Sequence, residues 1–383
     1  MKLELAPVVL RWARERAGMD RRALAGALKV SDEQVAEWEE TGGLTFGMVQ
    51  KLARATRTPE GQLFLGQPPR ERLPIPDFRT PSGKTAATAS PELLDTLHDA
   101  TRKQDWYRDY VLSHGGEPLR FVGTLSLSMR PEEAAASARQ SLELETRLRA
   151  DATSWEEALR LQISHLEERG ILILRNGVVG SNGRRALSPD EFRGFALSDP
   201  YAPLIFLNNK DSLGAQMFTL FHELVHIGLD QSGISNPFEN GETNHKVERF
   251  CNRAAAELLM PATEVREMIA SSGAVDPGAL ARKFRVSTFV ALIRLRELGR
   301  LDQASFRALY DAERLASAKR EQRASSGGNF YATELVRVGK SLARAVVESA
   351  LEGRTSYRDA CRLLGVSNAT TVNEMAKRLD LVR

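Results

Sequence analysis

The motif His-Glu-x-x-His occurs once in the chain, at residues 222–226, inside the otherwise apolar stretch 217–228. Residues four apart lie on one face of a helix, so His222 and His226 can both turn a ring nitrogen toward one metal ion. Glu223 lies beside them and is placed to act as a general base. A zinc ion that activates water needs one more protein ligand and one open position, so the fold must bring a third ligand to this helix.

The candidate third ligand is Glu248, in the helix-forming stretch 247–261 that Pro261 should end. Asn252 follows one turn later on the same helix face, where its amide can orient Glu248 through a hydrogen bond. His245 is a rival for the third position because it lies three residues before Glu248.

Together, the two segments resemble the ImmA/IrrE-type metallopeptidases, through HELVH at 222–226 and E-x-x-x-N-x-x-A-A-E-L-L-M-P at 248–261. The resemblance implies Zn²⁺ held by the two motif histidines and by the glutamate that opens the second motif, here His222, His226 and Glu248. The metzincin extension is absent, since Leu229 and Ser232 occupy the positions of its glycine and third histidine. The competing interpretation is a buried helix whose histidines form hydrogen bonds in the core.

Two further residues of the second segment carry expectations of their own. Cys251 stands where the family motif usually has alanine, three residues after Glu248. One interpretation is core packing, and the other is a thiol close enough to the metal to make activity redox-sensitive. Glu257 is expected to be a solvated helix residue.

The composition fits a multidomain protein without a disulfide framework. A chain of 383 residues with 42% hydrophobic content can bury a substantial core and is expected to form two or three domains. Only two cysteines are present, and no apolar segment has the length of a signal sequence or membrane span, so a reducing, cytoplasmic setting without a membrane is expected. The formal charge of +3 does not by itself indicate nucleic-acid binding.

Residues 1–66 have the helix spacing of a helix-turn-helix domain. Five helices are expected, at 10–17, 22–28, 32–40, 44–56 and 59–65. This region resembles XRE-type DNA-binding domains through the positions Arg14 to Gly18, Leu24, Ala25, Val30, Ser31, Val35, Trp38 and Glu39.

The helix expected to enter the major groove has the wrong charge for DNA. Its acidic residues are Asp32, Glu33, Glu37, Glu39 and Glu40. Because phosphates dominate DNA affinity, binding would depend on basic side chains nearby. The candidate DNA contacts are Arg21, Arg22, Lys29 and, for reading a base edge, Gln34. The other interpretation is a module that folds like a repressor and docks a protein.

A proline-rich linker is expected over residues 67–92, and a zincin-like α+β domain with a helical lead-in over residues 93–270. Short apolar stretches at 171–174, 192–197 and 203–207 predict a small sheet just before the motif helix. Its edge strand, placed at 203–208, is expected to hold an extended substrate by strand addition.

The rest of the chain is expected to be helical, as an extension over 271–315, an exposed tether over 316–328 and a C-terminal module over 329–383. The extension repeats the helix-turn-helix spacing at residues 279–287, and the module repeats it at residues 357–367. For each of them two interpretations are open: helix packing without nucleic acid, and DNA binding. The predicted fold class is therefore multidomain and mainly α, with one small sheet beside the motif helix.

The resemblance implies a zinc-dependent metallopeptidase and regulator, with a partner protein such as an XRE-type repressor as its substrate under stress. The alternative belongs to another class, an antitoxin-like or transcriptional regulator that binds DNA or a partner protein such as a toxin, with little proteolytic turnover. The fused architecture also resembles components of toxin-antitoxin systems.

Overall fold

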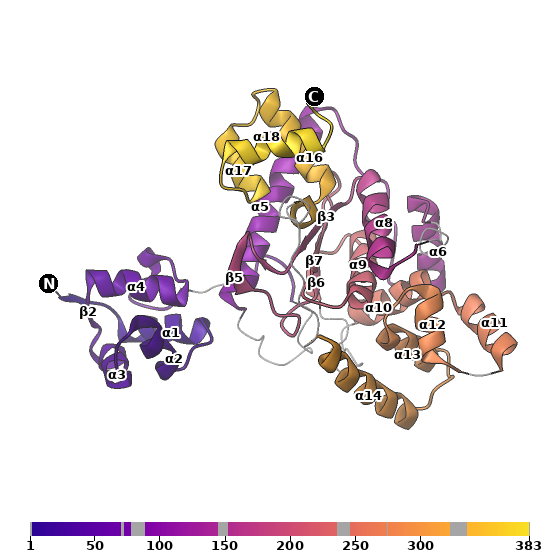
Figure 1. The fold of residues 1–383 in the computed structure, drawn as a ribbon, viewed down its shortest axis with the longest axis horizontal. Helices are drawn as coiled ribbons and strands as arrows, with labels where there is room; N and C mark the ends of the chain where they lie inside the picture. The colour runs from indigo at the N-terminus through magenta and orange to yellow at the C-terminus, as the bar shows by residue number, and fades with distance from the viewer. Residues whose placement is uncertain are drawn as a thin grey trace. The chain divides into compact units, whose positions relative to one another are not determined.

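The computed structural model describes residues 2–69, 73–77, 89–144, 152–235, 246–273, 275–321 and 335–382. The chain forms two compact units, Met1–Pro74 with Thr85–Leu97, and Ile75–Lys84 with His98–Arg383. Both are mostly helical, and a small mixed sheet lies in the second (Figure 1). No helix in the described part of the chain is long and apolar enough to span a lipid bilayer.

The N-terminal unit is a bundle of short helices, several of which are capped by side chains. Its elements are β1 (Lys2–Glu4), α1 (Pro7–Arg16), α2 (Arg21–Leu28), α3 (Asp32–Thr41), β2 (Gly43–Thr45), α4 (Phe46–Thr56) and the 3₁₀ helix η1 (Glu60–Phe64). Asp20 and Ser31 cap α2 and α3 by accepting backbone N–H groups, at 2.7 Å and 3.2 Å. The fifth expected helix is thus a 3₁₀ helix, and the antiparallel pairing of β1 with β2 was not expected because three-residue strands leave little sequence pattern.

One acidic side chain of α3 is buried. Glu39 accepts hydrogen bonds from Nε of Arg14 at 2.6 Å and from Nε of Arg21 at 2.9 Å. Glu39 is 2% exposed, so it does not face the solvent with the other acidic residues of α3. Arg21, expected to contact DNA, is therefore engaged in holding α2 against α3.

The sheet of the second unit has the strand order β3-β7-β6-β8. Its strands are β3 (Leu172–Asn176), β7 (Leu204–Asn208), β6 (Gly194–Leu197) and β8 (Gly233–Ser235), and a separate hairpin joins β4 (Val178–Val179) to β5 (Asn182–Ala186). β3 and β7 are parallel, whereas β6 is antiparallel to both of its neighbours.

The expectation that residues 203–208 form the edge strand is wrong, because β7 pairs on both sides. The edge strand next to β6 is β8, which has three residues and was not predicted from the sequence. The N–H of Ile234 in β8 donates to the carbonyl of Pro76 at 3.1 Å, so a piece of the expected linker pairs with this edge.

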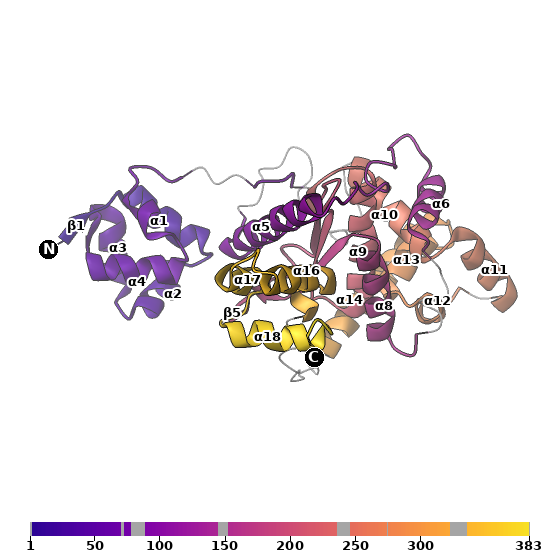
Figure 2. The same ribbon diagram turned by 90° about the horizontal axis from the view of Figure 1, so that it is seen from above.

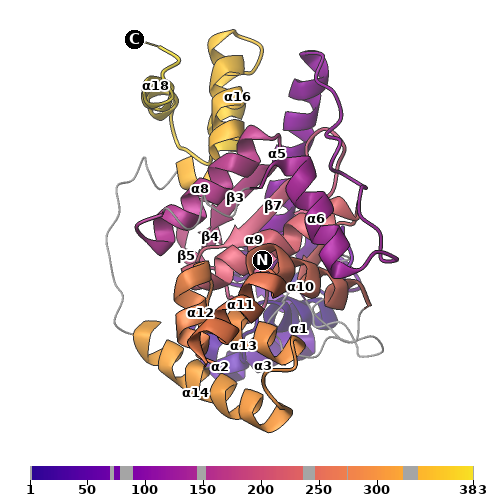
Figure 3. The ribbon, with the colours of Figure 1, turned by 90° about the vertical axis from the view of Figure 1, so that its right-hand side faces the viewer.

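Helices cover the sheet and extend from it (Figure 3). They are α5 (Pro91–Ser113), α6 (Pro131–Leu142), α8 (Trp155–Glu168), α9 (Leu213–Gly228), α10 (Lys246–Leu259), α11 (Ala262–Ser272), α12 (Pro277–Phe284), α13 (Thr288–Glu297) and α14 (Gln303–Glu321). Helix α14 continues to Glu321, so the first part of the expected tether, 316–321, is helical. The remainder of that tether lies outside the described residues.

A buried ion pair joins the helical extension to the domain that precedes it. Glu257 of α10 pairs with Nη2 of Arg294 in α13, and the Nε of Arg294 donates to the carbonyl of Met260 at 2.9 Å. Glu257 is 7% exposed, so the expectation that it is solvated is wrong. Because a buried charge requires a partner, this pair fixes α13 against α10.

The C-terminal module consists of α16 (Lys340–Leu351), α17 (Tyr357–Leu364) and α18 (Ala369–Arg378), and it lies beside α5 (Figure 2). Glu167 of α8 accepts the N–H of Ser341 at 3.2 Å, which supplies an acceptor for the first turn of α16. The hydroxyl of Tyr110 in α5 contacts Oε2 of Glu348 at 3.3 Å. The module is thereby attached at the start and the middle of α16.

The attachment at Glu167 should make the stability of the fold pH dependent. Burial raises the pKa of Glu167 to about 7, against its ordinary 4.5, although backbone N–H groups of Ser341 and Lys340 lower it. A raised folded-state pKa means that the stability is fully present below about pH 4.5 and is lost as the pH rises through 7, by up to roughly 3 kcal/mol. Glu167→Gln keeps an acceptor without a charge, so we expect its free energy of unfolding in urea to fall less between pH 5 and pH 8.

The matched control is Glu168→Gln, which changes the next residue, an exposed glutamate, in the same way. This variant should show nearly the full loss of stability seen in the unchanged protein, because the charge of Glu168 makes only a minor contribution to the raised pKa of Glu167. Identical pH profiles for Glu167→Gln and Glu168→Gln would contradict the assignment.

Candidate metal centre

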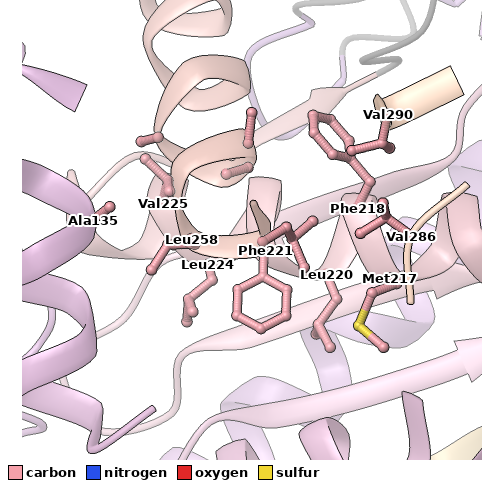
Figure 4. Packing of buried hydrophobic residues seen from close by; sticks show 14 of the residues in the cluster. Ala135, Met217, Phe218, Leu220, Phe221, Leu224, Val225, Leu258, Val286 and Val290 are labelled. Carbon is pink, nitrogen blue, oxygen red and sulfur yellow. The ribbon is translucent and has the colours of Figure 1, made fainter. Parts of the chain in front are cut away.

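Helix α9 carries the two motif histidines and is buried along nearly its whole length. Ser212 caps it by accepting the N–H of Ala215 at 3.3 Å. Apart from the face that carries His222, Glu223 and His226, the helix packs against apolar residues, which is typical of a helix in a protein core. Figure 4 shows this packing, with Leu220, Phe221, Leu224 and Val225 of α9 among the labelled side chains. The packing fixes the rotation of α9 and so directs its two histidines.

The structure brings His222 and His226 together with Glu248 of α10. The Nε2 atom of His222 lies 3.2 Å from Oε2 of Glu248, and the Nε2 atom of His226 lies 3.0 Å from Oε1. The two Nε2 atoms are 3.2 Å apart. All three residues are buried, at 0%, 0% and 2% exposure, so three potential ligand atoms converge on one point inside the protein.

These three residues fit a tetrahedral metal ion. With bonds of about 2.0 to 2.1 Å, two ligands of a tetrahedral zinc lie about 3.3 Å apart. The observed separations of 3.0 to 3.2 Å are close to that value. In addition, two imidazoles and a carboxylate are a common zinc donor set.

Charges within the trio favour an ionised carboxylate. Burial by itself would raise the pKa of Glu248, but His222 and His226 outweigh it and hold that pKa well below its usual range. Burial lowers the pKa of His226, which favours the neutral imidazole that binds a metal.

Glu223 lies beside the trio with its carboxylate unpaired. It is fully buried, and neither of its oxygens makes a hydrogen bond of standard geometry to the described residues. Burial first, and then the charge of Glu248, raise the pKa of Glu223 well above its usual value, and the nearby Ser235 only partly offsets them. A buried carboxyl group without a partner is costly, which is typical of a functional position.

Two residues that the sequence did not indicate complete the surroundings. The hydroxyl of Ser235 in β8 lies 3.4 Å from Nε2 of His226. At Gly194 in β6, an added Cβ would lie 2.5 Å from Cγ2 of Thr219 and 3.2 Å from Oε1 of Glu223, so glycine leaves room for this carboxylate. Neither residue belongs to a recognisable motif, and only the pairing of β6 with β8 brings them here.

The remaining candidate residues are Asn252, His245 and Cys251. Asn252 is half-buried on α10, but its Oδ1 has no partner among the described residues and it does not hydrogen-bond to Glu248. His245, the rival third ligand, lies outside the described residues. Cys251 is fully buried but outside the trio, and burial, with the charges of Glu248 and Glu223, raises the pKa of its thiol. This environment favours core packing for Cys251.

A buried cluster of two histidines from an HExxH helix and a glutamate from a second helix, beside a small mixed sheet, is the arrangement of a zincin-like metal site. Residues 166–296, which contain this centre, match the family of IrrE N-terminal-like domains. The radiation response metalloprotease IrrE of Deinococcus radiodurans is 32% identical over 145 residues, which cover 36% of this chain and 43% of that protein. The protein of the same name from Deinococcus deserti is 33% identical over 106 residues, covering 26% of this chain and 38% of that protein.

The similarity supports a metallopeptidase domain of IrrE type in the middle of the chain. The chain spans less than half the length of each of these curated relatives. Residues 338–378, in the C-terminal module, match a domain of unknown function, DUF8813.

Proposed function

We propose that the protein is a zinc-dependent metallopeptidase that hydrolyses a peptide bond in a partner protein. The observation that carries this proposal is the buried convergence of His222, His226 and Glu248 next to the unpaired carboxylate of Glu223. The match of residues 166–296 to IrrE N-terminal-like domains supports it independently.

The residues divide into metal holders and a proton carrier. His222, His226 and Glu248 would hold Zn²⁺, which supplies a Lewis acid that activates water and polarises a carbonyl. Glu223 takes a proton from the attacking water and passes it to the leaving amine. Burial, which raises the pKa of Glu223, makes its carboxylate a stronger proton acceptor once it is ionised.

The substrate we propose is a protein such as an XRE-type repressor or a toxin, in the cytoplasm and in response to stress. The basis is the resemblance of the two motifs and the similarity to the Deinococcus radiodurans protein, a radiation response metalloprotease. An extended substrate that pairs with the sheet edge at β8 would have to displace Pro76 from Ile234.

The test is purification with metal analysis, followed by incubation of the holoprotein with the products of neighbouring genes. Cleavage of one of them at a defined bond, abolished by a chelator and restored by Zn²⁺, supports the proposal. A protein that holds zinc yet cleaves none of these products under any condition would favour the alternative function.

The alternative is an antitoxin-like or transcriptional regulator, and the surface of α3 favours its protein-binding form. Asp32, Glu33 and Glu37 are exposed on this helix. Gln34, proposed to read a base, donates from Nε2 to Glu37 at 2.8 Å, and Arg21 is engaged with Glu39. Of the proposed DNA contacts, Arg21, Arg22 and Lys29 are all exposed, and Arg21 is the one held in an ion pair with Glu39.

We expect any DNA binding by the N-terminal unit to be weak and to strengthen when negative charge is removed. Asp32→Asn with Glu33→Gln should raise affinity for duplex DNA about tenfold at low salt, since each neutralised carboxylate removes repulsion from phosphates. Fluorescence anisotropy of the full chain measures this change. Asp105→Asn with Asp109→Asn, two exposed acids on α5, is the control. Equal effects of the two double variants would assign the gain to net charge alone.

A further inference from the structure

The C-terminal module has a second surface with the geometry of a binding site, distinct from the metal centre. A four-residue turn that begins at Gly365, with φ of 71°, joins α17 to α18. The N–H of Val366 donates to the carbonyl of Cys361 at 2.9 Å, and Asn368 accepts the N–H of Thr371 at 2.9 Å. Two helices joined by such a glycine-containing turn form the unit that places its second helix in the major groove of DNA.

Helix α18 has one face in the module's core and one toward the solvent. Its buried side chains are Thr371, Val372, Met375 and Ala376. Thr370, Asn373 and Lys377 are exposed and follow the spacing i, i+3, i+7, so they share the opposite face. The hydroxyl of Tyr357, the first residue of α17, donates to Oδ1 of Asn373 at 3.2 Å, so the start of α17 lies beside this same face.

Basic side chains accompany the exposed face of the module. Arg358 and Arg362 lie one turn apart on the exposed side of α17. Within the described part of the chain, neither guanidinium has an ion-pair or hydrogen-bond partner. Residues 335–382 contain eight basic and five acidic side chains, so the module has a positive balance. Unpaired guanidinium groups suit the geometry and charge of phosphates.

The two other helix pairs with helix-turn-helix spacing do not combine an exposed, non-acidic second helix with basic side chains that are unpaired among the described residues. In the pair α12–α13, no side chain between Thr288 and Arg296 is highly exposed, and Arg294 is buried against Glu257. In the pair α2–α3, the exposed face of the second helix is acidic, with Asp32 and Glu33 in its first turn. Among the three, α17–α18 is the pair in which arginines without an ion-pair partner in the described residues accompany a second helix whose exposed face is not acidic.

We propose that α17 and α18 bind double-stranded DNA, with Thr370, Asn373 and Lys377 of α18 facing base edges in the major groove. Arg358 and Arg362 contact the phosphate backbone. Asparagine is suited to bidentate recognition of adenine, and lysine to recognition of guanine. In the free protein Asn373 accepts from Tyr357 and Lys377 donates to Oε1 of Glu374 at 2.7 Å, so both side chains exchange these partners for bases on binding. The proposal does not depend on the metal centre, because none of these residues contacts it.

The test uses the full chain and a fluorescently labelled duplex of about 30 base pairs, long enough for about three turns of the double helix. Anisotropy titrations between about 50 and 200 mM salt give the affinity and its salt dependence. We expect Arg358→Glu with Arg362→Glu to weaken binding at least tenfold and to reduce the slope of log affinity against log salt by about two. Arg282→Glu with Lys283→Glu, an equal charge change on exposed residues of α12, should have a much smaller effect.

Asn373→Ala separates base recognition from backbone contact. After selection of a preferred duplex from a random library, this variant should lose the preference while keeping affinity for unselected DNA. Metal content and the thermal midpoint, measured for every variant, exclude unfolding as the cause.

Three results would overturn the proposal: no duplex binding at low salt, equal losses in the two charge-reversal variants, or a loss caused by Arg22→Glu instead. The last would place DNA binding in the N-terminal unit. A module that binds no duplex but a partner protein through the same arginines would likewise exclude DNA as its ligand.

Discussion

Replacing Glu223 by glutamine should abolish peptide-bond cleavage and leave metal binding intact. Glutamine has the shape of glutamate but cannot take a proton from water, so we expect cleavage of the identified partner to fall about 100-fold or more. Metal content should be unchanged, because Glu223 is outside the trio formed by His222, His226 and Glu248. Removing an unpaired buried carboxyl group should also leave the fold as stable as before, or slightly more stable.

The measurement pairs the initial rate of cleavage with zinc content for each variant. Glu267→Gln, at an exposed position on α11, is the matched control and should retain full activity. Undiminished cleavage by Glu223→Gln would make Glu223 a structural residue and would remove the proposed mechanism.

The part of the metal centre that lies within one helix could be read from the sequence. The spacing of His222 and His226 is a local property of any α-helix, so it predicts their common direction without knowledge of the fold. Glu248 came from the resemblance of a second segment, and the structure places it against both histidines. The small sheet beside the motif helix is likewise present where short apolar stretches indicated it.

The residues of the metal centre whose position depends on strand order could not be predicted from the sequence. Ser235 and Gly194 reach the centre because β8 pairs with β6, and a strand of three residues has no distinctive periodicity. Residues 204–207 are all apolar, which is typical of a strand covered on both faces but does not say which strands pair with it. Sheet order is decided by tertiary packing, which local patterns do not contain.

Long-range ion pairs account for the errors on single charged residues. Glu257 was expected in solvent because nothing near it in sequence indicates Arg294, which lies 37 residues away. Glu39 was counted with the exposed acidic side chains of α3, but Arg14 and Arg21 hold it inside the N-terminal unit. In both cases a glutamate on a helix is compatible with solvent or with a buried partner, and only the fold decides between them.

Replacing Glu248 by glutamine should release most of the metal, and replacing His245 by alanine should not. An amide is a weaker, uncharged ligand for zinc, and changing partners that only orient a ligand already weakens metal affinity by about 10- to 100-fold, so loss of a direct carboxylate ligand should cost more. Competition with a chromophoric chelator measures the affinity. Metal retained in Glu248→Gln but lost in His245→Ala would move the third ligand to His245. If both variants kept zinc at full affinity, the two motif histidines would need a different third ligand, and the trio seen in the structure would not be the metal site.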